Sequence, residues 1–266
     1  MNQHFSAAAD HVARRLWQGQ IVSYRDPESG EVGLGAVLTS DEQTRSHQGS
    51  SLDSQRVTIC PITRNANSKW SIRTGAGNMR ADMIHTIGTS LWQVQPAEGM
   101  TGLREADIEK IIGHFSELTY PTRENMNSWE RRETNFTYGA LNWSRRAFVE
   151  RRDVKRGSYL SLVSEPTPEG FFISIRTTTQ KHQNDPHFIC ADKVMQREVL
   201  FNCSDVYLIH RSQFTDLEGW AHRYVLPAIA MTALSTFDDD VYHAFDACPP
   251  ATGVKGRAAT QTPRPH

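Results

Sequence analysis

Short strand-like segments that end at glycine- or proline-rich turns fill the first half of the chain. They are followed by one amphipathic helix at residues 104–118, with apolar side chains at helical spacing and acids in its first turn. The expected strands are residues 20–25, 33–39, 56–63, 69–74 and 78–88. This order predicts a small, strongly curved β-barrel closed by the helix.

The second half of the chain repeats this order of elements. Strand-like segments are expected at residues 157–164, 170–179 and 199–209, and a helix over 218–235 that Pro227 starts or kinks. We therefore predict a second barrel-like domain that is a diverged duplicate of the first. It would pack on the first domain about a pseudo-twofold axis.

Breaks in the apolar pattern, such as "TYPTREN" at 119–125, place the domain boundaries. The overall class is mostly β with helices (α+β). The predicted units are an N-terminal helix at 1–18, the first barrel at 19–119, a basic-aromatic connector at 120–155, the second domain at 156–247 and a disordered tail at 248–266.

The composition is that of an ordinary globular protein, with 38% hydrophobic and 22% charged residues. The longest apolar run, Val225–Met231, is too short to span a membrane, and the N-terminus lacks a signal peptide's apolar stretch. A cytoplasmic location is therefore expected. The four cysteines lie far apart and no histidine has a partner at metal-ligand spacing, so we expect reduced thiols, no metal site and no cofactor.

Basic residues gather in two places although the net charge is only −1. Residues 64–80 contain four basic residues and no acid, and residues 129–156 contain eight basic residues against four acids, interleaved with aromatic rings. Basic side chains bind phosphates and aromatic rings stack on unpaired bases, so this mixture suits a single-stranded nucleic acid. An amphipathic helix with a solvated basic face is the alternative.

Arg80 and Asp82 lie two residues apart on the expected strand 78–88, which places both side chains on one face. A surface ion pair of this kind contributes little to stability. The pair is also a suitable site for phosphate chemistry, because the arginine keeps the aspartate ionised and supplies rigid donors to phosphate oxygens. The residues alone leave both interpretations open.

Five segments in this order resemble the Kid/PemK/MazF group of toxin endoribonucleases, which are small SH3-like barrels of toxin–antitoxin pairs. The resemblance covers residues 17–119. "WQGQIVSYRDP" resembles the family's opening strand, "GAVLTS" its second strand, and "VTICPIT" the strand that ends in its site threonine, here Thr63. "RADMIHTIG" matches a family segment at Arg80, Asp82, Thr86 and Ile87, and "GMTGLREADIEKIIGHFSEL" resembles the closing turn and helix.

The resemblance implies a metal-independent endoribonuclease that cleaves single-stranded RNA to a 2′,3′-cyclic phosphate and a 5′-hydroxyl. Asp82 would be the general base, Arg80 the acid or phosphate stabiliser, and Thr63 a contact to the scissile phosphate. Arginine is a very weak proton donor, which favours the electrostatic role for Arg80. All three side chains are then expected in one open groove. A small antitoxin protein, and a homodimer or intrachain pseudo-dimer, are the partners implied.

The first hairpin departs from the family pattern, which has a histidine and an Arg-Pro pair there. Here Leu34 and Gly35 occupy the Arg-Pro places and the hairpin has no histidine. Arg25 or Arg64 could supply the missing cation, and these two residues together with Lys69 and Arg73 are the expected RNA-binding set.

Two other functions remain open at this stage. The first is a module that binds RNA or a toxin–antitoxin partner without catalysis, which the altered hairpin favours. The second is a toxin that acts on a protein target, as the related gyrase-inhibiting toxins do. Those toxins end in a Trp-Gly-containing tail, whereas this chain ends in a polar, proline-rich one.

Overall fold

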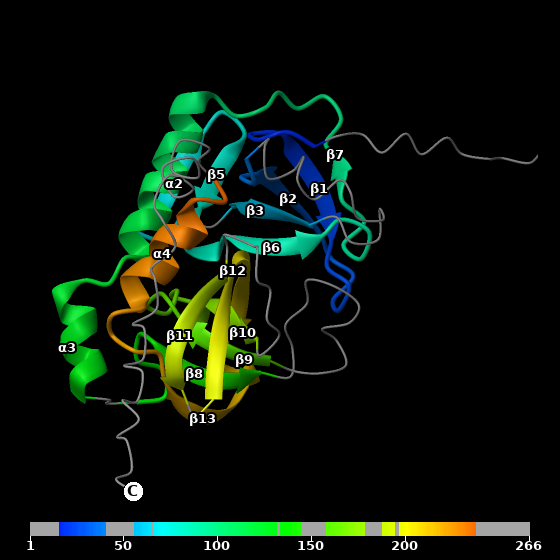
Figure 1. Ribbon diagram of the computed structural model, residues 1–266. Helices are drawn as coiled ribbons and strands as arrows, with labels where there is room; N and C mark the ends of the chain where they lie inside the picture. Colours follow the sequence, from blue (N-terminus) through cyan, green and yellow to red (C-terminus); the bar gives the residue numbers. More distant parts are fainter. Residues whose placement is uncertain are drawn as a thin grey trace, which may run out of the picture.

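The computed structural model describes residues 16–40, 56–64, 66–131, 134–144, 158–178, 188–194 and 197–237. The predictions of an N-terminal helix and of a disordered tail fall outside these residues, except for the last few residues of the helix segment. The described chain is mostly β with a few helices, as predicted, and it forms two sheets with α2 and α4 side by side next to them (Figure 1).

The first sheet contains seven strands in the order β4-β5-β3-β2-β1-β7, with β6 also paired to β3. Neighbouring strands are antiparallel. The strands are β1 (Ile21–Arg25), β2 (Val32–Val37), β3 (Arg56–Thr63), β4 (Ser71–Thr74), β5 (Gly77–Arg80), β6 (His85–Gly88) and β7 (Gln95–Pro96). Helix α2 (Glu105–Thr119) follows, which confirms the predicted helix.

The segment predicted as one strand over 78–88 is interrupted by the 3₁₀ helix η3 (Ala81–Met83). Strand β3 pairs with both sides of this interruption: Ile62 lies opposite Met79 and Ile59 lies opposite His85. Ile59 and Ile62 are three residues apart on β3, whereas Met79 and His85 opposite them are six apart, so the partner segment has three extra residues. The interruption buries Met79, Ala81 and Ile84 together, which an uninterrupted alternation of faces would not do.

The prediction of a closed barrel is not confirmed. The path of paired strands ends at β4 on one side and at β7 on the other, and these two do not pair with each other in the described residues. The terminal strands have four and two residues, which is too short for an extended seam. The apolar face is buried instead by α2, through Ile111 and Phe115, and by the second half of the chain.

The second sheet has the order β11-β12-β10-β9-β8-β13. Its elements are β8 (Ala140–Ser144), β9 (Ser158–Leu162), β10 (Phe171–Thr178), β11 (Phe188–Val194), β12 (Arg197–His210), η5 (Arg211–Gln213) and β13 (Phe214–Trp220). Helix α3 (Arg123–Arg131) precedes this sheet and α4 (Leu226–Leu234) follows it. Strand β8 and helix α3 lie within residues 120–155, which we expected to be a connector.

The helix predicted over 218–235 is wrong in its first part. Residues up to Trp220 belong to β13, and the helix begins only at Leu226, with Pro227 in its first turn. Proline is well suited to this position because it lacks the N–H that a first turn leaves unbonded. Strand β13 pairs with β8 through two register shifts, an irregularity that the sequence pattern does not indicate.

The two sheets have the same strand order when each is numbered along the chain: fourth, fifth, third, second, first, last. Their registers also correspond, since Val37 lies opposite Ile59 in the first sheet and Leu162 lies opposite Ser174 in the second. Even the interruption recurs. Ile175 lies opposite Val206 but Arg176 opposite Asn202, which leaves three extra residues at 203–205 where the first sheet has η3. In this correspondence Arg80 matches Asn202 and Asp82 matches Ser204.

Each sheet also begins at an equivalent glycine. Gly19 has φ +84° and Gly139 has φ +80°, a left-handed conformation that favours glycine. The Gly19 and Gly139 amides donate to the carbonyls of Val37 and Leu162 at 2.8 and 2.7 Å. Their own carbonyls accept from Leu103 and Ala221, both at 2.8 Å. Each glycine therefore ties the first strand of its half to the segment that leads into the closing helix.

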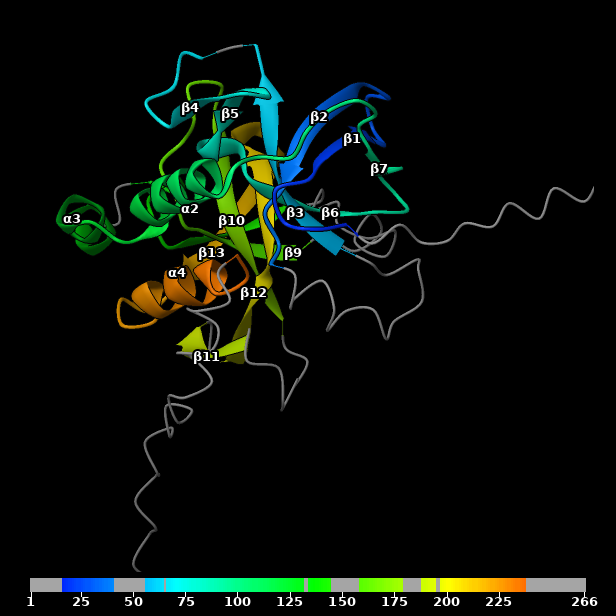
Figure 2. The same cartoon turned by 90° about the horizontal axis from the view of Figure 1, so that it is seen from above.

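The two halves share one hydrophobic core, to which both sheets and both helices α2 and α4 contribute buried residues. Strand β6 lies against β12, and the Val206 amide donates to Thr86 Oγ1 at 2.8 Å. Phe115 of α2 meets Phe237 edge-to-face with ring centroids 5.1 Å apart. The view from above shows α2 and α4 packed side by side across this junction (Figure 2).

Candidate functional site

Arg80 is the last residue of β5, and its side chain is only 1% exposed. Its Nε donates to Asp82 Oδ1 at 2.7 Å and its Nη2 to Asp82 Oδ2 at 2.9 Å. Asp82 is itself 3% exposed and lies in η3. The two residues predicted to act together therefore form a bidentate ion pair, but the pair is buried.

The other edge of the same guanidinium binds a carboxylate from the second half of the chain. Nη1 donates to Glu169 Oε1 and Nη2 to Glu169 Oε2, both at 2.9 Å. Glu169 comes from the turn between β9 and β10, 89 residues away from Arg80, and its side chain is 35% exposed. Arg80 is thus held between two carboxylates and links the two halves.

Ser68 completes the contacts of Asp82. Its hydroxyl donates to Asp82 Oδ2 at 2.7 Å and accepts from the Trp70 amide at 3.2 Å. Ser68 lies in the crossover that connects β3 with β4. The carboxylate is therefore bound on two sides, by the guanidinium and by the serine hydroxyl.

The electrostatics of this cluster favour the charged forms of Arg80 and Glu169. Hydrogen bonds to Asp82 and Glu169 raise the pKa of Arg80 above its ordinary value. The hydrogen bond from Arg80 lowers the pKa of Glu169 to about 2. Arg80 is therefore unsuited to donating a proton, and its chemistry in this arrangement is electrostatic.

The predicted open groove is wrong for Arg80 and Asp82. Thr63, the last residue of β3, is partly exposed and lies opposite Asn78, whose other neighbour is Arg73 on β4. Arg80 stands two residues further along β5, on the same face of the sheet as Asn78. Thr63 and Arg80 therefore share a face, but Arg80 is buried where that face meets the turn carrying Glu169.

The expected RNA-binding residues divide into two groups. Arg64, Lys69 and Arg73 are exposed and lie on the crossover and on the edge strand β4, and we call these three residues the basic crossover. Lys69 Nζ lies over the Trp70 ring, 4.7 Å from its centroid. The basic crossover borders the buried cluster, because Ser68 precedes Lys69 and Ser71, opposite Arg80, precedes Arg73 by two residues.

Arg25 does not join this group. It ends β1, two strands away from β3 in the sheet, and its Nη1 donates to the carbonyl of Gly30 at 3.1 Å. The hairpin around it carries three acids, Asp26, Glu28 and Glu31. Arg25 therefore lies in an acidic neighbourhood that disfavours a phosphate.

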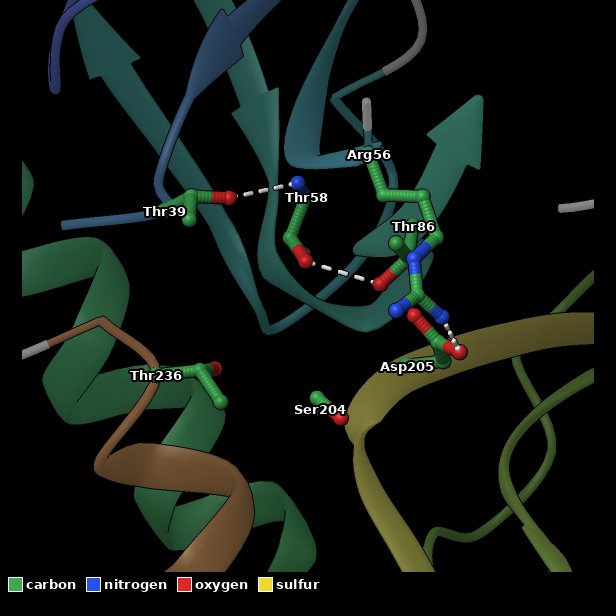
Figure 3. A pocket seen from close by; sticks show the side chains of 7 residues that line it. All are labelled: Thr39, Arg56, Thr58, Thr86, Ser204, Asp205 and Thr236. Carbon is green, nitrogen blue, oxygen red and sulfur yellow. Dashed lines mark hydrogen bonds and ion pairs between the residues drawn. The ribbon is translucent and has the colours of Figure 1, made fainter. Parts of the chain in front are cut away.

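A small polar pocket lies at the junction and is lined by residues from both halves (Figure 3). Its volume is enough for about one water molecule. Arg56 of the first half forms an ion pair with Asp205 here, and Thr58 and Thr86 share a hydrogen bond of 2.7 Å between their hydroxyls. The lining residues are Thr39, Arg56, Thr58, Thr86, Ser204, Asp205 and Thr236. The pocket thus contains Ser204, the register counterpart of Asp82.

Two contributors to the site were not predicted from the sequence, Glu169 and Ser68. Glu169 sits in the turn "TPEG" at 167–170, and nothing in that turn indicates an arginine 89 residues away. A polar residue a few positions before a strand, such as Ser68 three residues before β4, is common in turns and is not a specific signal.

Within the described ranges, no three His, Cys, Asp or Glu side chains gather as ligands for a metal ion. Cys60 and Cys203 are buried thiols, and burial raises the pKa of the Cys60 thiol. Among the helices that the structure describes, none is long and apolar enough to cross a membrane.

No family model matches the sequence, and a comparison with curated proteins finds no match. Three solved structures show a partial likeness, each with a TM-score of 0.30. An endoribonuclease in complex with its cognate antitoxin, from a mycobacterial species, is 14% identical and is covered over 90% of its length by 37% of this chain. A MazE–MazF structure from Deinococcus radiodurans is 14% identical, with coverage of 91% and 38%. A mycobacterial endoribonuclease is 15% identical, with coverage of 92% and 39%. At this TM-score and identity the likeness carries no argument about function.

Proposed function

We propose that this protein binds single-stranded RNA through the basic crossover. The observation that carries the proposal is the exposure of Arg64, Lys69 and Arg73 around one edge of the first sheet, in a stretch from 64 to 80 that contains no acid. Three exposed cations without a competing carboxylate nearby in sequence attract phosphates. Thr63 and Asn78 add neutral polar groups on the same face for sugars and bases.

The test is the binding of a mixed-sequence single-stranded RNA at several salt concentrations. Replacing Arg64, Lys69 and Arg73 together by alanine removes three phosphate contacts, so the slope of log K against log salt should fall by about 2. The matched control replaces Lys110, Arg123 and Arg223, three exposed cations outside both basic stretches, and should leave the slope unchanged. Equal slopes for the two triple variants would overturn the proposal.

A second candidate function is metal-independent cleavage of the bound RNA. The observation in its favour is the Arg80–Asp82 pair itself, with Ser68 on the same carboxylate, directly beside the basic crossover. Asp82 would take the proton of the 2′-hydroxyl, which then attacks the phosphorus, and Arg80 would stabilise the charge on the phosphorane. The products would be a 2′,3′-cyclic phosphate and a 5′-hydroxyl.

Cleavage is tested by incubating the purified protein with mixed-sequence RNA in EDTA and reading the fragment ends. Asp82→Ala should slow cleavage by about 10²–10⁴-fold with RNA binding largely kept. RNA that stays intact with the wild-type protein would leave binding as the function. A small antitoxin protein is the further partner that a toxin function would require, and co-expression with a neighbouring small reading frame would test it.

The matching strand orders and registers support a fused pair of equivalent halves, as in an intrachain pseudo-dimer. In this arrangement the second half has Asn202 and Ser204 at the positions of Arg80 and Asp82. These residues provide neither a base nor a cation, so only the first half would be catalytic. Superposition of residues 19–119 on 139–237 would test this equivalence.

A further inference from the structure

We propose that Glu169 occupies a phosphate-binding site on Arg80, so that the chain blocks its own Arg80–Asp82 pair with a carboxylate. The ligand that would replace this carboxylate is a phosphodiester of RNA. This inference rests on the proposed function for the identity of the ligand, but not for the existence of the site.

The geometry of the contact is that of arginine with an oxyanion. Nη1 and Nη2 each donate to one oxygen of Glu169 at 2.9 Å, which is a bidentate fork. The planar guanidinium matches carboxylate and phosphate oxygens in the same way, so either anion can fill these two hydrogen bonds. The N–H of Nε and the second N–H of Nη2 stay on Asp82, at 2.7 and 2.9 Å, and do not compete for the ligand.

The Glu169 side of the fork faces solvent, whereas the Asp82 side does not. The side chain of Glu169 is 35% exposed, against 1% for Arg80 and 3% for Asp82. An incoming phosphate can therefore reach Nη1 and Nη2 once the Glu169 carboxylate leaves. A phosphodiester also brings the same single negative charge as the carboxylate it replaces, so the cluster keeps its formal charge.

The turn that carries Glu169 is built to hold it in place. Thr167 forms two hydrogen bonds with Phe171. Its amide donates to the Phe171 carbonyl at 2.7 Å, and its Oγ1 accepts from the Phe171 amide at 3.1 Å. Gly170 follows with φ +90°, which glycine adopts without strain, and its amide donates to the Thr167 carbonyl at 2.8 Å. The Glu169 carboxylate is therefore positioned by the fold, unlike a surface side chain that meets an arginine by chance.

The neighbourhood also favours an anion once Glu169 is removed. Lys69 is exposed and directly follows Ser68, whose hydroxyl binds Asp82 at 2.7 Å. Arg73 lies on β4, two residues after the partner of Arg80. Both cations belong to the basic crossover, so an RNA strand bound there would carry its phosphates past the turn of Glu169.

The experiment compares the thermal unfolding of Glu169→Ala and the wild type with and without inorganic phosphate, at constant ionic strength. The variant leaves Nη1 without its partner, so its Tm should fall by about 5 °C. Phosphate should restore about half of this loss, because it binds the folded variant only, and it should leave the wild-type Tm unchanged. Chloride at the same ionic strength should restore nothing.

Two further variants control this result. Glu165→Ala removes an exposed acid from the same turn and should show neither the loss nor the rescue. Glu169→Gln keeps the side-chain volume and one acceptor, so it provides the same phosphate measurement if the alanine variant does not fold. If phosphate stabilises the Glu169 variants no more than it stabilises Glu165→Ala, the inference is overturned. The Arg80–Glu169 contact is then only a salt bridge between the two halves.

RNA separates this inference from the proposed function. Rescue of Glu169→Ala by phosphate without RNA binding by any variant would keep the site and reject the proposed function. RNA binding through the basic crossover without phosphate rescue would support the proposed function and reject the phosphate site on Arg80. If both hold, Glu169→Ala should bind the mixed-sequence RNA about tenfold more tightly than the wild type, since one phosphate no longer competes with a carboxylate.

Discussion

The two halves of the molecule place different chemistry at the same position of the same sheet. In the first half, Arg80 directly precedes the three-residue interruption and Asp82 lies within it, and the two form a buried ion pair. In the second half, the matching residues are Asn202 and Ser204, and the Ser204 hydroxyl donates to Asn202 Oδ1 at 2.5 Å. Each half thus joins residues i and i+2 across its interruption, one through charges and the other through neutral groups.

The difference extends to the contact with the opposite half. The first-half cluster receives a carboxylate, Glu169, from the segment just before β10, while the second-half pocket receives a cation, Arg56, from the start of β3. The two contacts lie near corresponding places in the two halves, and the incoming side chains have opposite charges. The scaffold therefore fixes where the halves meet, and the side chains decide whether the meeting point can bind an anion.

The largest expected effect comes from removing the buried cation of the first half. Arg80→Ala leaves the carboxylates of Asp82 and Glu169 together without a counter-charge, and the free energy of unfolding should fall by about 3–5 kcal/mol. Urea unfolding measures this loss. The control Arg73→Ala changes an exposed residue of the neighbouring strand and should cost within about 0.5 kcal/mol. A loss below about 1 kcal/mol for Arg80→Ala would show that the cluster does not join the halves.

A smaller effect is expected on the second-half side. Arg56→Ala removes the cation paired with Asp205, but Asp205 Oδ2 keeps the hydrogen bond from Asn202 Nδ2 at 3.1 Å. The side chain of Arg56 is 24% exposed, so solvent compensates part of the loss. We expect a decrease of about 2 kcal/mol in the free energy of unfolding. A loss equal to that of Arg80→Ala in the same urea titration would mean that the two contacts are equivalent in energy as well as in place.

The ion pair of Glu169 should also appear in the pH dependence of stability. Because Arg80 lowers the pKa of Glu169 from 4.5 to about 2, the ionised carboxylate stabilises the folded state above pH 4.5, and this contribution is lost as the pH falls toward 2. The stability of the wild type relative to Glu169→Gln should therefore be constant above pH 5 and shrink below it. Urea midpoints at pH 6, 4, 3 and 2 measure the difference, with Glu165→Gln as control. A difference that does not change with pH would contradict the ion pair.

Much of the fold could be predicted from the sequence, because the strands with alternating or continuous apolar residues, such as β3 and β10, are recognisable without tertiary information. Strands β7, β8, β11 and β13 were not predicted. Strand β13 contains Asp216 and Glu218, and it pairs with β8 through register shifts, so its polar residues hide the pattern. The helix was predicted over 218–235 because apolar residues there have helical spacing, but these residues belong to two different elements, β13 and α4.

The pairing of Arg80 with Asp82 could also be predicted, because two neighbouring residues need only local geometry to meet. Their burial could not be predicted, since arginine is rarely fully buried without a partner and the partner, Glu169, comes from a turn in the other half. A contact between residues this far apart depends on how the two sheets pack. The same limit explains why the three-residue interruption was missed: the pairing of β3 with both sides of it, and the burial of Ala81 and Ile84 in the shared core, depend on tertiary structure.

The smallest expected effect is in the neutral counterpart of the Arg80–Asp82 pair. Asn202→Ala removes the hydrogen bonds of Asn202 with Ser204 and with Asp205, which are 2.5 and 3.1 Å long. Asp205 keeps Arg56, so no charge is left alone, and the loss should be about 1 kcal/mol, well below that of Arg80→Ala. The same urea titration gives both values, and Thr101→Ala, which removes an exposed hydroxyl before α2, provides the baseline. If Asn202→Ala proves as costly as Arg80→Ala, the neutral contact stabilises the fold as strongly as the charged one. Arg80 would then be kept charged for a reason other than stability, such as the binding of a phosphate.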